Sequence, residues 1–149
     1  MVIFLDRLGY IELLHQVADV VLTPAVVREL RAGTGTPGSS VPDLPWIEIR
    51  APASEDIDEV LHGLRANTGE RETVALAQSG TVTAVIDEGP ARRYARQRGL
   101  SVSSTLALLV GLHQRGLATR TVEEDLTLLD VAGMYLTEEL RAWTVGQVR

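Results

Sequence analysis

The chain has 149 residues, no cysteine and a formal net charge of −6 from 20 acidic and 14 basic residues. Its length predicts one domain over residues 1–149, and the lack of thiols excludes disulfides, thiolate metal sites and a cysteine nucleophile. All the basic residues are arginine, which excludes the chemistry of P-loop, Schiff-base and receiver-type lysines. The negative charge argues against a generally basic surface for nucleic acid.

Hydrophobic residues make up 45% of the chain and aromatic residues only 4%. A core of Leu, Val, Ile and Ala suits helices packed on a parallel sheet. No apolar run of about 18 residues and no secretory signal pattern is present, so we expect no membrane span and a cytoplasmic location.

The first half of the chain predicts alternating helices and strands. Residues 1–4 form a stub, and the spacing of apolar residues predicts a helix from Leu5 to Leu14. Thr23-Pro24 reads as an N-cap followed by a first-turn proline. The further elements expected here are a buried strand at 19–22, a helix from 24 to 31, a loop at 33–40, an edge strand at 46–50 and a helix at 53–65.

The second half continues the alternation. We expect a helix from Gly69, a strand at 81–86, a helix after Asp87, a strand at 100–103 and a helix at 105–114. Residues 120–149 form a helical tail of two amphipathic segments separated by Gly133. Such alternation is typical of a parallel sheet with right-handed crossovers, so the predicted fold is α/β, a three-layer α/β/α sandwich with a central parallel sheet.

Two acidic positions are placed at one edge of this sheet. Glu70 opens the helix at 69–77, and Asp87 closes the strand at 81–86, with Glu88 next to it. A helix of about ten residues spans roughly 15 Å and a strand of about six roughly 20 Å, so Glu70 and Asp87 end at similar heights. That height is the carboxyl edge, where open α/β sheets bind ligands.

Structural roles are an alternative for each of these residues. Glu70 and Glu72 would stabilise the start of any helix, and Asp87 could cap a helix beginning near Pro90. An arginine stripe lies just past the acidic edge and suits either phosphates or an acidic segment of a partner; a face that contacts only solvent is the structural alternative. Its members are Arg92, Arg93 and Arg96. The three histidines, on separate helices, have no metal-ligand spacing.

Several runs of the chain, in order and at matching spacing, resemble the PIN-domain nucleases, especially the VapC-type toxin branch of toxin–antitoxin systems. The resemblance covers nearly the whole chain and rests on an ordered series of motifs rather than on one. These runs are Leu5 to Gly9, Leu22 to Leu30, Gly69 to Ala77, Val85 to Glu88, Ala91 to Ala95 and Gly99 to Leu109.

The resemblance implies cleavage of single-stranded RNA by metal-activated water. Carboxylates suit Mg²⁺ or Mn²⁺, because these hard cations prefer oxygen ligands. Glu70 and Asp87 match the family's catalytic metal ligands, and Glu88 would contact the metal through water. The hydroxyls of Ser104 and Thr105 stand near a fourth position, and with Arg92 they are expected to bind the substrate. The implied partners are RNA, a cognate antitoxin protein and a second copy of the chain in a homodimer.

One departure from the family lies at the amino end. The family's first strand ends in an Asp, and alignment on Leu5 and Gly9 puts that Asp before Met1. Asp6 is the nearest carboxylate, but its helical phase places it inside the following helix. Either the chain was begun one strand too late, or the protein has lost a ligand. The second alternative predicts a catalytically inactive PIN-like module that acts through protein binding or dimerisation.

Overall fold

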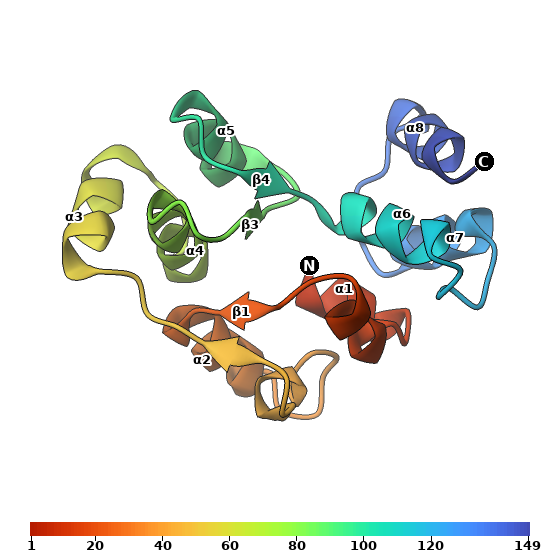
Figure 1. Ribbon diagram of the computed structural model, residues 1–149, viewed down its shortest axis with the longest axis horizontal. Coiled ribbons are helices and arrows are strands. Elements are labelled where there is room, and N and C mark those ends of the chain that lie inside the picture. The colour runs from red at the N-terminus through yellow and green to blue at the C-terminus, as the bar shows by residue number, and fades with distance from the viewer.

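The computed structural model describes residues 1–149, in which short parallel strands alternate with helices (Figure 1). The helices are α1 (Val2–Arg7), α2 (Pro24–Ala32), α3 (Ser54–Gly63), α4 (Thr68–Gln78), α5 (Gly89–Gln97), α6 (Thr105–Gln114), α7 (Val122–Val131) and α8 (Glu138–Val148). Two 3₁₀ helices are η1 (Ile11–Gln16) and η2 (Val41–Asp43). The strands are β1 (Val21–Leu22), β2 (Glu48–Ile49), β3 (Ala84–Val85) and β4 (Val102–Ser103).

The four strands form two separate pairs. β1 lies parallel to β2, and β3 lies parallel to β4, with no pairing between the two groups (Figure 1). The predicted α/β fold with parallel strands is therefore confirmed, but the sheet is divided into two half-sheets where the sequence predicts one continuous sheet.

The amino-terminal helix differs from its prediction. The sequence predicts one helix from Leu5 to Leu14 after a stub, whereas α1 already begins at Val2 and η1 follows as a separate turn. Gly9 lies between them with a φ of +74°, a conformation that glycine adopts without strain and that ends a helix. The spacing of apolar residues nevertheless identified the buried side of this segment, because Leu5 and Leu14 are both fully buried.

The remaining helices agree closely with their predictions. The Thr23 side chain accepts a hydrogen bond from the backbone N–H of Val26 and caps α2. Asn67 does the same for α4, which begins before Gly69. The predicted strands at 19–22, 46–50, 81–86 and 100–103 all form but are only two residues long. None of the helices combines the length and the apolar character needed to cross a membrane.

Two hydrophobic clusters correspond to the division of the sheet. The larger cluster joins α1, η1, β1 and α2 to the carboxyl-terminal helices, with Leu5, Leu14 and Leu109 fully buried at its centre. The smaller one joins α3, α4, β3 and α5 around Val60 and Val74. Each half-sheet therefore packs mainly on helices of its own cluster.

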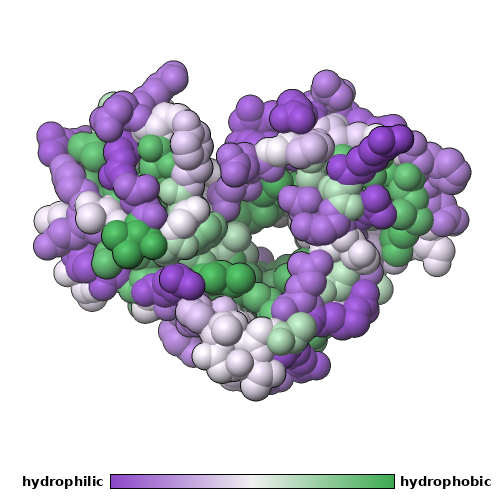
Figure 2. All heavy atoms as spheres, turned by 180° about the vertical axis from the view of Figure 1, so that it is seen from behind, coloured by the Kyte–Doolittle hydropathy of each residue, from purple (hydrophilic) through white to green (hydrophobic).

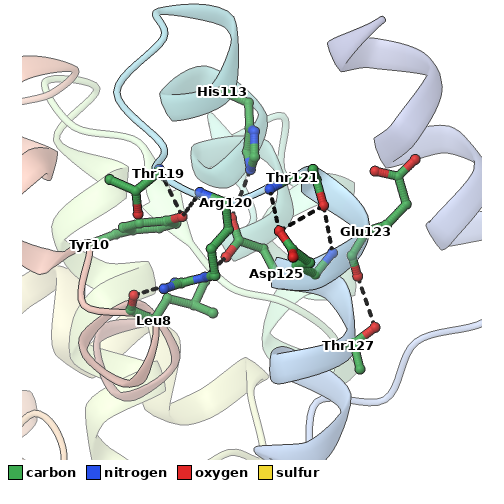
Figure 3. A network of polar contacts seen from close by, with 10 residues as sticks. Leu8, Tyr10, His113, Thr119, Arg120, Thr121, Glu123, Asp125 and Thr127 are labelled. Carbon is green, nitrogen blue, oxygen red and sulfur yellow. Dashed lines mark hydrogen bonds and ion pairs between the residues drawn. The ribbon is translucent and has the colours of Figure 1, made fainter.

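A buried polar network fixes the carboxyl-terminal helices to the start of the chain (Figure 3). Asp125 is fully buried in α7, and its two oxygens bond Arg120 Nε at 2.7 Å and His113 Nε2 at 2.8 Å. This bond to Asp125 raises the pKa of Arg120 and keeps the guanidinium charged. A buried carboxylate is tolerated only with such partners.

Arg120 also reaches the amino-terminal segment. Its guanidinium donates to the Leu8 carbonyl and lies 4.8 Å from the centre of the Tyr10 ring (Figure 3). The Tyr10 hydroxyl accepts the backbone N–H groups of Thr119 and Arg120. One arginine thus joins α7 to the turn between α1 and η1.

We predict that Asp125→Ala lowers the free energy of unfolding by about 3 kcal/mol, because it removes the fully buried carboxylate that pairs with both the buried His113 and the half-buried Arg120. Asp130→Ala is the matched control, since Asp130 lies on the same helix as Asp125 but forms an exposed ion pair with Arg141 of α8. It should change stability by at most about 1 kcal/mol. Urea unfolding followed by circular dichroism measures both, and equal effects would contradict a structural role for the network.

Candidate acidic site

A cavity of about 950 Å³ lies between the two half-sheets and is here named the central cavity. Its walls include residues 20–23 around β1 and residues 81–88 around β3, and α4 lines a further side. Figure 2 shows an opening near the centre of the molecule, with hydrophobic residues on its left and lower sides and more hydrophilic ones on its right. The carboxylates near the carboxyl ends of the strands that line this cavity belong to Glu29, Glu70, Asp87 and Glu88.

Asp87 is held in place by the beginning of α6. Its Oδ1 accepts the backbone N–H of Thr105 at 2.7 Å, and its Oδ2 accepts the Thr105 hydroxyl at 2.8 Å. The same Oδ2 lies 3.7 Å from the α-amino nitrogen of Met1. The sequence suggested that Asp87 could cap the helix beginning near Pro90, but its helical partner is the amino end of α6. A carboxylate is stabilised there by the helix dipole.

Glu70 lies in the first turn of α4, on the α4 side of the central cavity. Its backbone N–H donates to the Asn67 side chain at 2.8 Å, so the cap fixes the start of the helix that carries it. The Glu70 side chain is half-buried, and its carboxylate forms no hydrogen bond within the protein. It is therefore available for a ligand in the cavity.

Glu72 does not line the central cavity. Its Oε2 accepts the backbone N–H of Ala25 at 2.7 Å, and its Oε1 lies 3.7 Å from Arg28. Glu72 therefore joins α4 to the amino end of α2. It stabilises the start of α2 and not, as the sequence suggested, the start of its own helix.

Glu29 is an acidic residue of the site that the sequence analysis missed. It projects from the middle of α2, and its Oε1 accepts the backbone N–H of Gly69 at 3.1 Å. A Cβ atom at position 69 would stand 2.8 Å from the Glu29 carboxylate oxygens, so the glycine permits this approach. The available signal was that α2, like α4, starts at the carboxyl edge, although Glu29 itself lies in the second turn of α2 and not next to its start.

The three residues expected to bind substrate lie at the same edge but already have partners. Arg92 donates to the backbone carbonyls of Ile86 and Ser103 and so joins the carboxyl ends of β3 and β4. Burial lowers its pKa. Ser104 caps α6 by accepting the N–H of Ala107, and Thr105 is fully buried against Asp87.

The acidic side chains do not converge. No three side chains of Asp, Glu or His lie close enough to hold one metal ion. Glu29 and Glu70 reach the central cavity from α2 and α4, whereas Asp87 and Glu88 follow β3. The residues as arranged therefore supply the right donor type for a hard cation without forming a site for it.

A second hollow adjoins the acidic edge and is here named the side groove. It has a volume of about 410 Å³ and shares Asp87 and Glu88 with the central cavity. Arg96 of α5 lines it together with Tyr135, whose side chain is 74% exposed. A cation and an exposed aromatic ring thus lie beside the carboxylates.

Comparison with known proteins identifies a family. The model of the family DUF3368, described as a PIN domain, matches residues 1–148. No curated protein and no solved structure matches the chain significantly.

We predict that Thr105→Val lowers the free energy of unfolding by about 1–2 kcal/mol, because it removes a buried hydroxyl that donates to a carboxylate. The shape of the side chain is retained. Thr83→Val is the control, since that hydroxyl bonds Ser101 at an exposed position, and its effect should stay near zero. Chemical denaturation checks both, and a neutral Thr105→Val would show that Asp87 is not anchored in this way.

Proposed function

The chain belongs to the PIN-domain family, and we propose that it is a metal-dependent endonuclease for single-stranded RNA. We further propose that it acts in the cytoplasm and that it is the toxin of a toxin–antitoxin pair. The observation that carries the proposal is the set of four carboxylates lining one cavity at the carboxyl edge. Open α/β folds bind their ligands at this edge.

The proposed roles follow from the positions of the acids. Glu70 and Asp87 are the catalytic ligands for Mg²⁺ or Mn²⁺, and Glu88, exposed just before α5, contacts the metal through water. Glu29 is added as a further carboxylate within the same cavity. Each would have to approach a common ion more closely than it does in the described arrangement.

The side groove supports a path for RNA. Its Arg96 suits a phosphate, and Tyr135 offers a face on which a base can stack. Asp87 and Glu88 also line the groove, so an RNA strand lying in it would pass close to the acidic edge. Ser104 lines the groove as well, whereas Arg92 and Thr105 would act mainly by shaping the edge, because their polar groups already bond the protein.

Partner binding is part of the proposal. α7 and α8 expose Val131, Leu140 and Trp143, with Val131 82% exposed. Exposed apolar residues on neighbouring helices are typical of protein contacts. They support binding of an antitoxin or of a second copy in a homodimer.

We expect the chain to cleave single-stranded RNA with Mg²⁺ or Mn²⁺ and to lose that activity in chelator. Glu70→Gln and Asp87→Asn should each reduce cleavage of a labelled oligonucleotide to the level without protein, because an amide removes the charge that holds the cation. Glu55→Gln, an exposed acid at the start of α3, is the control and should leave cleavage unchanged. Equal cleavage in chelator would refute the assignment.

A catalytically inactive module is the second candidate. It is favoured by the absence of three metal-binding side chains within reach of one ion. Titration calorimetry with Mn²⁺ separates the two candidates, because micromolar or tighter binding that Glu70→Gln abolishes would be incompatible with an inactive site.

Arg96→Ala should weaken binding of a single-stranded oligonucleotide and lower the slope of log affinity against log salt by about 0.7, the value of one phosphate contact. Arg149→Ala is the matched control, since Arg149 is exposed at the carboxyl end of α8 and does not line the groove. Fluorescence anisotropy over a salt series measures both slopes. An unchanged slope for Arg96→Ala would exclude the side groove as the path.

A further inference from the structure

The side groove contains two aromatic rings, although the chain has few. The chain has one phenylalanine and three tyrosines, and Phe4 and Tyr135 both line this groove. Phe4 packs partly against the larger hydrophobic cluster, whereas Tyr135 is largely exposed. An exposed ring beside a hollow is available to stack on a flat ligand, and such stacking is a main way in which proteins hold an unpaired base.

The size of the groove suits one nucleotide. Its volume of about 410 Å³ lies at the lower end of the range for small-ligand pockets, about 300–1,000 Å³. Its apolar walls include Leu106, Leu136 and Leu140. A hollow of this size with apolar walls can hold one planar group, and its few polar groups then decide which group fits.

One carboxylate at the groove has no partner in the protein. Glu88 is exposed and precedes α5 as its N-cap residue, yet its side chain makes no capping hydrogen bond. Asp87, which also lines the groove, already accepts the backbone N–H and the hydroxyl of Thr105. Of these two carboxylates, Glu88 is therefore the one with both oxygens free to accept hydrogen bonds from a ligand.

Two hydroxyls at the groove can donate hydrogen bonds. Ser104 and Thr137 cap α6 and α8 by accepting backbone N–H groups of those helices, each at 3.2 Å. The hydrogen of each hydroxyl is not used by the cap and can be donated to a ligand. The groove thus combines these donors with an acceptor at Glu88, and Arg96 supplies a positive charge for a phosphate.

Guanine is the base that matches this set of groups. A carboxylate can accept two hydrogen bonds side by side, and guanine alone among the RNA bases has two adjacent N–H donor groups, on N1 and N2. Adenine and cytosine place their amino group next to a ring nitrogen that accepts, so the second carboxylate oxygen would face a lone pair. Uracil has one N–H between two carbonyls. The O6 and N7 acceptors of guanine remain for the hydroxyls.

We propose that the side groove is a guanine subsite. Tyr135 stacks on the base, Glu88 accepts its N1–H and N2–H groups, and the hydroxyls of Ser104 and Thr137 donate to its acceptors. The subsite rests on the RNA-cleaving function proposed above and adds which base is bound. A carboxylate has about four lone-pair sites, so this use of Glu88 is compatible with its contact to a metal-bound water.

A guanine held here also fixes the position of the strand. Glu88 lines both the side groove and the central cavity, so the base lies beside the edge at which cleavage is proposed. The phosphate that reaches the acidic edge is then a constant number of nucleotides away from the bound guanine. With Mn²⁺ present, mapped cuts in a long single-stranded RNA should therefore lie at one constant distance from guanines.

The main test measures binding in chelator, where no metal contributes. Labelled oligouridylates with a single central guanine or a single central adenine are titrated with the full chain and followed by fluorescence anisotropy. The guanine strand should bind on the order of tenfold more tightly, the discrimination expected of one bidentate pair. Glu88→Gln should shift the preference toward adenine, because an amide presents one donor and one acceptor, as the adenine edge does.

The controls separate base selection from charge and from stacking. Glu138→Gln removes another exposed carboxylate, from the first turn of α8 and outside the groove lining, and should keep the guanine preference. Tyr135→Ala should weaken binding of both strands by about tenfold and leave their ratio unchanged, since stacking tolerates every base. Tyr135→Phe keeps the ring and should bind as the unaltered chain does.

The outcomes distinguish this inference from the proposed function. If the unaltered chain binds both strands equally well, the guanine subsite is wrong and the nuclease proposal stands. A guanine preference that Glu88→Gln leaves unchanged would overturn the role of Glu88, and unchanged binding by Tyr135→Ala would overturn the stacking role. Failure to bind any single-stranded RNA would overturn the proposed function together with the subsite.

Discussion

The hydrogen-bonding requirement of parallel strands is the constraint on which the rest of this structure depends. A parallel strand inside a sheet needs a neighbour on each edge and cover on each face. β1 and β3 have only one neighbour each, so the sheet divides and each half packs on its own hydrophobic cluster. The central cavity is the direct result of that division.

The same division decides how the acidic residues are placed. Glu29 and Glu70 depend on the packing of α2 against α4, which is fixed by the bond from Gly69 to Glu29 and by the bond from Ala25 to Glu72. Asp87 depends on β3 and on the start of α6. The two groups border one cavity without sharing an ion, because they belong to different half-sheets.

Helices α6 to α8 belong to the cluster of the first half-sheet, although in the sequence they follow the second. Asp125 and Arg120 hold them to the turn after α1, and Asp87 holds the first turn of α6 to the end of β3. α6 therefore connects the two halves, and the side groove lies beside that connection. This explains how the arginine and tyrosine of the groove come to border the acidic edge.

The sequence by itself determined the alternation of helices and strands, the cap at Thr23, the break between two helices at Gly133 and the position of Asp87 after a strand, because these depend on local propensity and spacing. It also predicted that Glu70 opens a helix at the same edge. Tertiary structure decided the rest. Glu29 lies at the site only because α2 packs on α4, and the Arg92 guanidinium donates to two backbone carbonyls instead of facing a ligand. The division of the sheet is likewise a tertiary feature. Local patterns carry no information on which strand edges meet, since pairing depends on residues distant in the chain.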